Sequence, residues 1–251
     1  MKTDSRQELD RFWAHELGVD PGVLARAPEV YCAEQRLYSG VQLFRRGDRL
    51  VLAAPPDRTQ QVQDAIRGRS PDEVFSAKWL QSVFVGDAEK ILGPAHVNYA
   101  DSTSFRSESA RPARPISASD AAAYHTLAAA LGSKEVEDSG FSGEAFPAFG
   151  GFSAEVLCAA ASYTVWQPSI AHIIVATHPD HRRKGFASAA IGALAADAFA
   201  RGLILQYRAV AWNTGSLALA RALGFSHYCS TLYVRLRAAA PERPASQRKA
   251  T

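Results

Sequence analysis

Residues 170–186 read IAHIIVATHPDHRRKGF and combine three local signals. The first eight residues are mostly apolar and rich in β-branched side chains, which is typical of a buried strand. His178-Pro179 ends this strand, a short basic loop follows, and the next segment, ASAAIGALAADAFA, has the alanine content of a helix. A strand, a basic loop with a glycine and then a helix predict a row of free backbone N–H groups at a helix N-terminus, where phosphate oxygens bind.

The glycine and the cations of this loop suit a diphosphate. Gly185 lets the backbone approach an anion without a Cβ in between, and Ala187 keeps the first helical turn thin. Arg182, Arg183 and Lys184 add positive charge. The spacing is neither that of a P-loop, GxxxxGK[ST], nor that of a dinucleotide-binding GxGxxG turn. The pattern R-x-x-G-x-A therefore indicates a phosphate-binding loop of another kind.

This loop resembles the pyrophosphate-binding motif Q/R-x-x-G-x-G/A of the GCN5-related N-acetyltransferases (the GNAT superfamily), which binds acetyl-coenzyme A (acetyl-CoA). A second motif, from Asn213 to Gly224-Phe225, is similar to the family's N-x-x-[AS]…G-F signature and lies at the family's usual distance. The resemblance covers residues 111–237. It implies an α/β protein with the GNAT fold, a mixed, mostly antiparallel central sheet with splayed central strands and flanking helices. It also implies an N-acetyltransferase that uses acetyl-CoA as donor.

In this family the coenzyme lies where two central strands diverge, here the predicted strands 170–177 and 203–210. Backbone groups of the first strand would pair with the pantetheine arm and stabilise the thioester oxygen. Asn213 would hydrogen-bond the arm or the diphosphate, Ser216 would cap the following helix, and no metal is needed. The resemblance thus implies the following cofactor-binding residues: Ile174, Val175, Ala176, Thr177, Arg182, Arg183, Lys184, Gly185, Phe186, Ala187, Ser188, Asn213 and Ser216.

The proton donor of the reaction is not marked in the sequence. Acetyl transfer to an amine requires that the departing coenzyme thiolate be protonated. The family places a tyrosine in the helix after Asn213, but residues 219–222 read Leu-Ala-Arg-Ala. Tyr207, Tyr228 and Tyr233 lie nearby at other positions, so the acid stays unassigned.

The base has three candidates. His172 is the titratable residue on the central strand, although a lone strand histidine also suits a structural role. Glu155 and Glu144 compete with it, acting directly or through water. His178 and His181 flank Pro179-Asp180, and we interpret them as part of a tight turn and not as metal ligands.

Two features of the sequence are candidates for the binding site of the acceptor amine. The acidic segment 134–144 is either a solvated face or a wall that attracts a cationic amine. Tyr163 and Trp166 end the second strand of a predicted hairpin (145–149 and 153–164, joined by Gly150-Gly151) and either line the pocket or pack the hairpin. The candidate acceptor-binding residues are Glu135, Glu137, Asp138, Tyr163 and Trp166.

The layout of the whole chain resembles GNAT enzymes with an N-terminal extension, a subgroup that includes aminoglycoside-inactivating kasugamycin 2'-N-acetyltransferases. The resemblance implies acetylation of a cationic aminoglycoside amine of the kasugamycin type, and hence antibiotic resistance. Two alternatives stay open. The acceptor is another amine, such as a polyamine, an amino acid or a protein N-terminus, or the chain is a non-catalytic acyl-CoA-binding module.

Composition along the chain predicts two domains and a tail. Residues 1–110 are expected to form a smaller accessory α/β domain. Arg106 to Pro115, RSESARPARP, has the composition of a linker. Residues 111–237 would then form the acetyltransferase domain, and residues 238–251 a disordered tail.

Charge, hydropathy and cysteine spacing limit the partners. The 28 Lys and Arg exceed the 25 Asp and Glu by only three, and no basic stripe with interleaved aromatics predicts nucleic-acid binding. No apolar run has the length of a membrane span, and no secretory signal begins the chain. The three cysteines lie far apart, as free thiols of a reducing cytosol do. We expect a cytoplasmic protein that binds a small-molecule amine, with homodimer formation left open.

Overall fold

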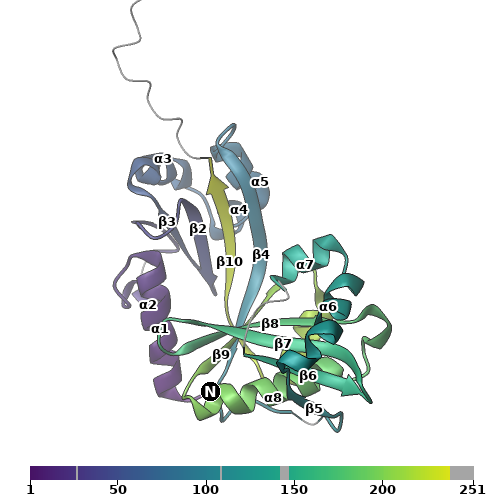
Figure 1. The fold of residues 1–251 in the computed structure, drawn as a ribbon. Coiled ribbons are helices and arrows are strands. Elements are labelled where there is room, and N and C mark those ends of the chain that lie inside the picture. Colours follow the sequence, from purple (N-terminus) through teal and green to yellow (C-terminus); the bar gives the residue numbers. More distant parts are fainter. Residues whose placement is uncertain (27, 108, 142–146, 238–251) are drawn as a thin grey trace, which may run out of the picture. The chain divides into compact units, whose positions relative to one another are not determined.

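The computed structural model describes residues 1–26, 28–107, 109–141 and 147–237 (Figure 1). The chain divides into two compact units. Unit 1 consists of Met1–Trp13 and Ala95–Ser230, and unit 2 consists of Ala14–Pro94 and the chain from Thr231 onward. Three elements run from one unit into the other: α1 (Thr3–Leu17), β4 (Ala88–Ala100) and β10 (Ser226–Leu236).

Unit 2 packs short helices on a small sheet. Strand β1 runs parallel to β3, and β3 forms an antiparallel hairpin with β2. Its core contains Leu43, Leu52 and Phe84, all buried. The elements that lie wholly in this unit are α2 (Val23–Arg26), β1 (Val30–Glu34), β2 (Gly40–Arg46), β3 (Arg49–Ala54), α3 (Pro56–Ile66), α4 (Pro71–Val74) and α5 (Ala77–Val83).

Unit 1 has helices on both faces of a larger mixed sheet. Within the described residues the strand order is β1-β3-β2-β10-β4-β9-β8-β7-β6-β5, and the part from β10 to β5 contributes to unit 1. The β8–β9 pair is parallel, whereas β4–β9, β7–β8, β6–β7 and β5–β6 are antiparallel. The elements are β5 (Ala113–Pro115), a 3₁₀ turn (Ala118–Asp120), α6 (Ala121–Ala130), α7 (Ser133–Ser139), β6 (Ala148–Ser153), β7 (Val156–Trp166), β8 (Ile170–Thr177), a second 3₁₀ turn (Pro179–His181), α8 (Phe186–Ala200), β9 (Ile204–Val210) and α9 (Thr214–Ala222).

The parallel pair β8–β9 separates after three residues. Its register runs from Ile170 opposite Ile204 to His172 opposite Gln206 and then stops, whereas β7 stays paired with β8 as far as Thr177. From Ile173 to Thr177, the edge of β8 toward β9 therefore has no strand neighbour among the described residues. We call this divergence the fork. It is the splay that the resemblance implies, and it leaves backbone donors and acceptors available for a ligand.

Each face of the unit 1 sheet is covered by its own helices. On the first face, Ile173, Tyr163 and Tyr207 pack against α8 and α9 in one buried cluster. On the other face, Ala160 and Ala176 belong to a second cluster with residues of α6. We call these the α8 face and the α6 face. Side chains alternate between the two faces along each strand.

The segment predicted as a linker is held against the rest of unit 1. Ala113–Pro115 form strand β5 and pair with β6. Ser109 Oγ donates a hydrogen bond to the Gly185 carbonyl at 3.1 Å, and Arg111 Nε donates to the Lys184 carbonyl at 3.2 Å. The division between the units falls at Pro94–Ala95 and not near residue 110, because the second half of β4 pairs with β9.

The prediction of a hairpin turn at Gly150-Gly151 is wrong. Both glycines lie inside β6, and the turn is made by Ala154-Glu155, where Ala154 has φ 49°. A Cβ on Gly151 would lie 2.4 Å from the carbonyl oxygen of Phe186. The glycine is thus required because the first residue of α8 packs directly on the backbone of β6.

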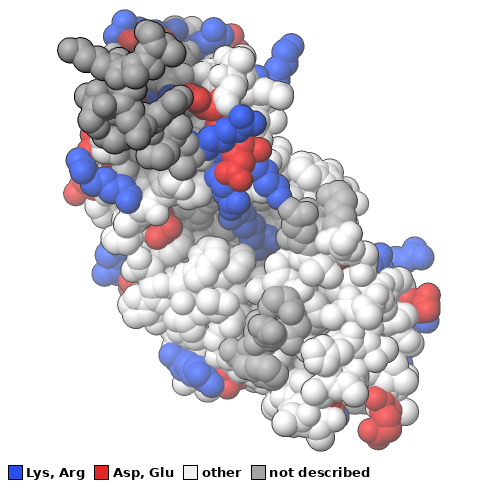
Figure 2. Space-filling model, turned by 45° about the horizontal axis from the view of Figure 1, so that its top comes forward, with Lys and Arg blue, Asp and Glu red and all other residues white. Residues whose placement is uncertain are grey.

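Charged side chains are interspersed on the surface. On the face shown in Figure 2, most Lys and Arg side chains have an acidic neighbour, and large areas are uncharged. Typical pairs are Arg45–Asp72 and Arg114–Asp120, each at 2.7 Å. Among the helices of the described residues, none combines the length and the apolar character needed to cross a membrane.

Candidate functional site

The loop between β8 and α8 presents backbone N–H groups. His178 Nδ1 accepts a hydrogen bond from the Asp180 N–H at 3.3 Å and so supports the 3₁₀ turn, as the turn interpretation of this histidine requires. Gly185 is the N-cap of α8 and has φ 86°, a conformation that other residues adopt only with strain. The Ala189 N–H is bonded to the Gly185 carbonyl, at 3.1 Å. The N–H groups of the turn before it have no intrahelical acceptor and can bind an anion.

The cations of the loop are anchored to the backbone around it. Arg182 Nε donates to the Thr177 carbonyl at 3.4 Å, and Lys184 Nζ donates to the Asp180 carbonyl at 2.8 Å. Arg182 Nη2 also lies 2.6 Å from Glu135 Oε2. Glu135 is therefore an ion-pair partner of the loop, which differs from the acceptor-binding role predicted for it.

A cavity of about 450 Å³ begins at this loop and reaches the fork. Its walls come from β8, the N-terminal turn of α8, β9 and α9. It is lined by Glu135, Val175, Thr177, His181, Arg182, Arg183, Gly185, Phe186, Ala187, Ser188, Tyr207, Asn213, Gly215, Ser216 and Leu219.

Most of the predicted cofactor-binding residues meet in this cavity. Ile174, Ala176 and Lys184 are not among its lining residues, because the first two point to the α6 face and Lys184 Nζ turns back to Asp180. The role implied for Ile174 and Ala176 is that of their backbone groups, which lie on the edge of β8 that is not paired with β9. Tyr207 lines the cavity and was not assigned there from the sequence.

The start of α9 differs from the prediction in one respect. Asn213 Oδ1 accepts a hydrogen bond from the Ser216 N–H at 3.0 Å, so Asn213 is the helix cap. Ser216 lies within the first turn, and its predicted capping role is wrong. Its Oγ is instead 3.0 Å from the hydroxyl of Tyr207.

His172 stands at the fork on the α6 face, within a chain of hydrogen bonds. Its Nδ1 is 2.8 Å from Gln206 Oε1, and Gln206 Nε2 donates to the Tyr99 hydroxyl at 2.5 Å. The same hydroxyl accepts from Trp13 Nε1 at 2.9 Å. Because the Gln206 oxygen faces the imidazole, Nδ1 carries the proton and Nε2 is left as an acceptor.

Burial keeps His172 neutral. Burial lowers its pKa to about 4, against the opposing effect of the hydrogen bond to Gln206, and Arg208 adds a smaller lowering effect. The indole of Trp166 stacks on the imidazole, with ring centres 4.1 Å apart and 12° between the planes. At neutral pH the site therefore offers an uncharged hydrogen-bond acceptor beside an aromatic face.

The predicted pair of aromatic acceptor residues is not brought together. Trp166 lies on the α6 face with His172, whereas Tyr163 lies on the α8 face, where its hydroxyl donates to Asp197 Oδ2 of α8 at 2.6 Å. Tyr163 is buried among apolar side chains. This placement gives Tyr163 the packing role that was the alternative interpretation.

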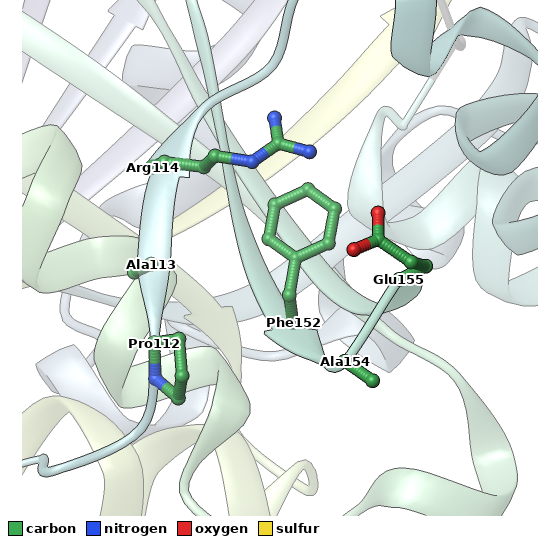
Figure 3. A pocket seen from close by; sticks show the side chains of 6 residues that line it. All are labelled: Pro112, Ala113, Arg114, Phe152, Ala154 and Glu155. Atoms are coloured by element: carbon green, nitrogen blue, oxygen red, sulfur yellow. The ribbon is translucent and has the colours of Figure 1, made fainter.

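Glu155 is not brought together with His172. It lies in the turn between β6 and β7, beside Arg114 and Phe152, where these side chains line a separate cavity of about 260 Å³ (Figure 3). Thr164 is the β7 residue opposite His172, and the strand from Val156 to Thr164 spans roughly 27 Å. Glu155 is thus too far away to take a proton in a reaction at the fork.

The remaining predicted carboxylates cannot be placed. Glu144 lies outside the described residues, as do the side chains of Glu137 and Asp138. In the part of the chain that is described, no three His, Cys, Asp or Glu side chains are grouped so that they could hold a metal ion.

Comparisons with known proteins agree with this geometry. Residues 150–232, which contain both motifs, match the family model described as GNAT acetyltransferase. A search of curated proteins found no match. An acetyltransferase of the GNAT family from Novosphingobium aromaticivorans has a TM-score of 0.50 and 19% identity over 75% of this chain and 84% of its own.

Two further solved structures are similar but more distant. A GCN5-related N-acetyltransferase-like protein from Streptococcus suis has a TM-score of 0.46 and 18% identity, over 78% of this chain and 83% of its own. A GNAT-family acetyltransferase from Colwellia psychrerythraea has a TM-score of 0.47 and 15% identity, over 63% and 61%. Residues 150–232 are thus similar to the GNAT acetyltransferase family, a similarity that implies the use of acetyl-CoA.

Proposed function

We propose that this protein transfers the acetyl group of acetyl-CoA to a primary amine of a small cationic molecule. The observation that carries the proposal is the cavity between the α8 N-terminus and the fork. One end offers backbone N–H groups and arginines to a diphosphate. The other end lies at the fork, where His172, a neutral acceptor of hydrogen bonds, is placed on the opposite face of the sheet. These two ends match the two substrates of such a transfer.

The donor end follows from backbone geometry. The unpaired edge of β8 from Ile173 to Thr177 can pair with the amide-bearing pantetheine arm as an added strand would. With the diphosphate on the first turn of α8, the arm then points along β8 toward the fork. Backbone N–H groups at this edge are the donors that would stabilise the oxyanion of the thioester.

The acceptor end follows from the position of His172. The amine approaches from the α6 face and must be neutral when its nitrogen attacks the thioester carbon. Nε2 of His172 accepts a hydrogen bond from this nitrogen and takes its proton as the C–N bond forms. The low pKa of His172 keeps Nε2 unprotonated before the reaction. The stacked Trp166 supplies a flat surface for the body of the acceptor.

The narrower proposal is an aminoglycoside acceptor of the kasugamycin type, and the function would then be antibiotic resistance. Trp166, 37% exposed, supports it, because sugar rings pack on aromatic faces. The acidic sequence of α7 supports it less than the sequence alone suggested, since Glu135 is paired with Arg182. Polyamines, amino acids and peptide N-termini are the alternative acceptors, and a non-catalytic acyl-CoA-binding module is the alternative to an enzyme.

The test is thiol release from acetyl-CoA with kasugamycin, other aminoglycosides, polyamines, amino acids and short peptides. We expect release that requires both the protein and a cationic amine. Turnover with kasugamycin and not with the other amines would support the narrower proposal. Coenzyme binding by calorimetry without release for any amine would favour the binding module and contradict the enzyme.

The loop arginine gives a prediction for coenzyme binding. Arg182→Ala should weaken acetyl-CoA binding by about three- to tenfold, since one half-exposed cation near the diphosphate is lost. Glu135→Gln is the matched control, because it breaks the same ion pair and keeps the cation. Calorimetric affinities should be unchanged or tighter for this control. An equal loss in both variants would show that the ion pair, and not the arginine charge, supports binding.

A further inference from the structure

Thioester aminolysis leaves a thiolate that needs a proton, and the cavity narrows the choice of donor. Among its described lining residues, His181, Arg182, Arg183 and Ser188 carry side-chain N–H or O–H groups at the α8 end. The C–S bond breaks at the other end, at the fork. Among the described lining residues, Tyr207 carries a phenol O–H at the fork end of the cavity, where the thiolate forms.

We propose that Tyr207 is the catalytic acid that protonates the coenzyme thiolate, and that Ser216 positions its hydroxyl. This inference rests on the proposed acetyl transfer and adds to it the group that the sequence left unassigned. The proposed acid is a tyrosine on strand β9. The family's tyrosine lies in the helix that corresponds to α9, and this chain has Ala220 in that stretch.

The position of Tyr207 follows from the register of the fork. It is one residue beyond Gln206, the last β9 residue paired with β8, so its backbone lies where the strands diverge. Its side chain lies on the α8 face, opposite to that of Gln206. The acceptor site and the phenol thus approach the fork from opposite faces, so that the amine nitrogen and the sulfur each have a separate group for proton transfer.

The hydroxyl of Tyr207 is held over the first turn of α9. It is 3.0 Å from Ser216 Oγ, and its ring packs edge-on against Phe225 at 5.4 Å. Ala220, one turn further along α9, is in the same buried cluster and leaves room for the ring. Side chains on a helix lean toward its N-terminus, so a longer residue at Ala220 would reach toward the turn that Tyr207 already contacts.

Burial keeps the phenol of Tyr207 protonated before the thiolate forms. Desolvation raises the pKa of Tyr207, and the hydrogen bond to Ser216 opposes part of the rise. A thiolate that forms beside Val175 and Leu219 is desolvated by the same cavity, which raises the pKa of its thiol as well. Burial thus raises the pKa of both the Tyr207 phenol and the coenzyme thiol. The difference between the two pKa values is therefore smaller than if only the phenol were buried.

The protons of the reaction are balanced by Tyr207 on the α8 face and His172 on the α6 face. As the amine nitrogen bonds to the carbonyl carbon, the C–S bond breaks, and sulfur keeps the electron pair and takes the Tyr207 O–H proton. Ser216 donates its hydroxyl hydrogen bond to the phenolate, which is then reprotonated from solvent. The proton that the amine loses leaves through His172 Nε2 to solvent, so no net charge accumulates.

Three other tyrosines of unit 1 have hydrogen-bond partners outside the cavity. Tyr99 bonds to Trp13 and Gln206, and the hydroxyl of Tyr228 donates to Asp10. Tyr163 donates to Asp197. Tyr163→Phe is therefore a matched control, because it removes one hydroxyl and one hydrogen bond from a buried tyrosine outside the cavity.

The kinetic test compares Tyr207→Phe with the wild-type protein, using acetyl-CoA and its selenoester analogue. A selenolate leaves readily without a proton, so loss of the acid should matter less for it. We expect kcat with acetyl-CoA to fall about a hundredfold, kcat with the selenoester to fall less than about fivefold, and coenzyme affinity to stay within about twofold. Ser216→Ala should lower kcat with acetyl-CoA by about tenfold, and Tyr163→Phe should leave it unchanged. An equal loss with both donors, or no loss, would overturn the proposal.

A second measurement needs no acceptor. The thiolate absorbance of bound coenzyme A is titrated in the wild-type and Tyr207→Phe proteins. A hydrogen bond from Tyr207 stabilises the thiolate, so the thiol pKa should be about one unit higher in the variant. Bound coenzyme with the same thiol pKa in both proteins overturns the role of Tyr207 alone. No binding of coenzyme A would overturn the proposed function together with this inference.

Discussion

Replacing His172 by alanine should lower kcat/KM for acetyl transfer by about a hundredfold to a thousandfold, in the range usual for loss of a general base. The reason is the position of its Nε2, which is free to accept a proton while Nδ1 is held by Gln206. The measurement is steady-state thiol release with the acceptor found in the amine panel. Coenzyme affinity should change by less than about threefold, because His172 does not line the cavity.

The matched control is His125→Ala, which removes an exposed histidine from α6. It should keep wild-type kcat/KM. If His172→Ala retained full activity, His172 would be a packing residue under Trp166, and the proton would have to leave by water. A loss confined to coenzyme affinity would contradict the acceptor role as well.

The buried imidazole also gives a dependence of stability on pH. The folded-state pKa of His172, about 4, lies below the unfolded value of 6.5, so the unfolded chain takes up a proton more readily. The stabilising contribution is complete above about pH 6.5 and is lost as the pH falls toward 4. The free energy of unfolding, measured with denaturant at several pH values across this range, should depend less on pH in His172→Ala than in the wild-type protein.

Local spacing was sufficient to predict the loop at which the cavity begins. The strand, Arg182, Gly185 and the following helix are contiguous, so the sequence motif carries the geometry directly, and the cavity lies there. The second motif was also found, but Asn213 and Ser216 exchanged roles. An N-cap is defined by the residue at which helical dihedrals begin, and an Asx side chain three residues ahead of Ser216 takes that place more readily.

The aromatic pair illustrates a rule that the sequence could have used. Tyr163 and Trp166 are three residues apart on one strand, and an odd separation sends two side chains to opposite faces. The structure separates them in this way, Trp166 with His172 and Tyr163 with Asp197. Period-two alternation excludes a shared pocket once the strand is extended to Trp166, where β7 ends.

Long-range pairing could not be predicted from the sequence. Nothing local shows that Ala95–Ala100 pairs with β9, so the division of the chain was placed near residue 110 and not at Pro94–Ala95. The same limit applies to Tyr207 and Ser216. Their contact depends on how α9 packs on β9, and the sequence shows only that Tyr207 lies near the helix in which the family places its tyrosine.

Gly151→Ala should reduce both folding stability and coenzyme binding, because one methyl group would occupy the contact between β6 and α8. The added Cβ would lie 2.4 Å from the carbonyl oxygen of Phe186 and 3.1 Å from its carbonyl carbon. Both are backbone atoms of the first α8 residue, so relief requires a shift of the helix N-terminus. Overpacking of this kind costs about 1–3 kcal/mol in the free energy of unfolding.

The same shift moves the N–H groups that would hold the diphosphate, so acetyl-CoA affinity should fall at least about tenfold, as measured by calorimetry. Gly132→Ala is the matched control: Gly132 has φ −68°, and an added Cβ would meet nothing within 4 Å. Unfolding and binding should both stay close to wild type in this control. If Gly151→Ala lost stability but kept its affinity for acetyl-CoA, the clash would be relieved by a shift of β6 and not of α8. The anion-binding turn would then be stiffer than its contact with β6, and Gly151 would be needed for folding alone.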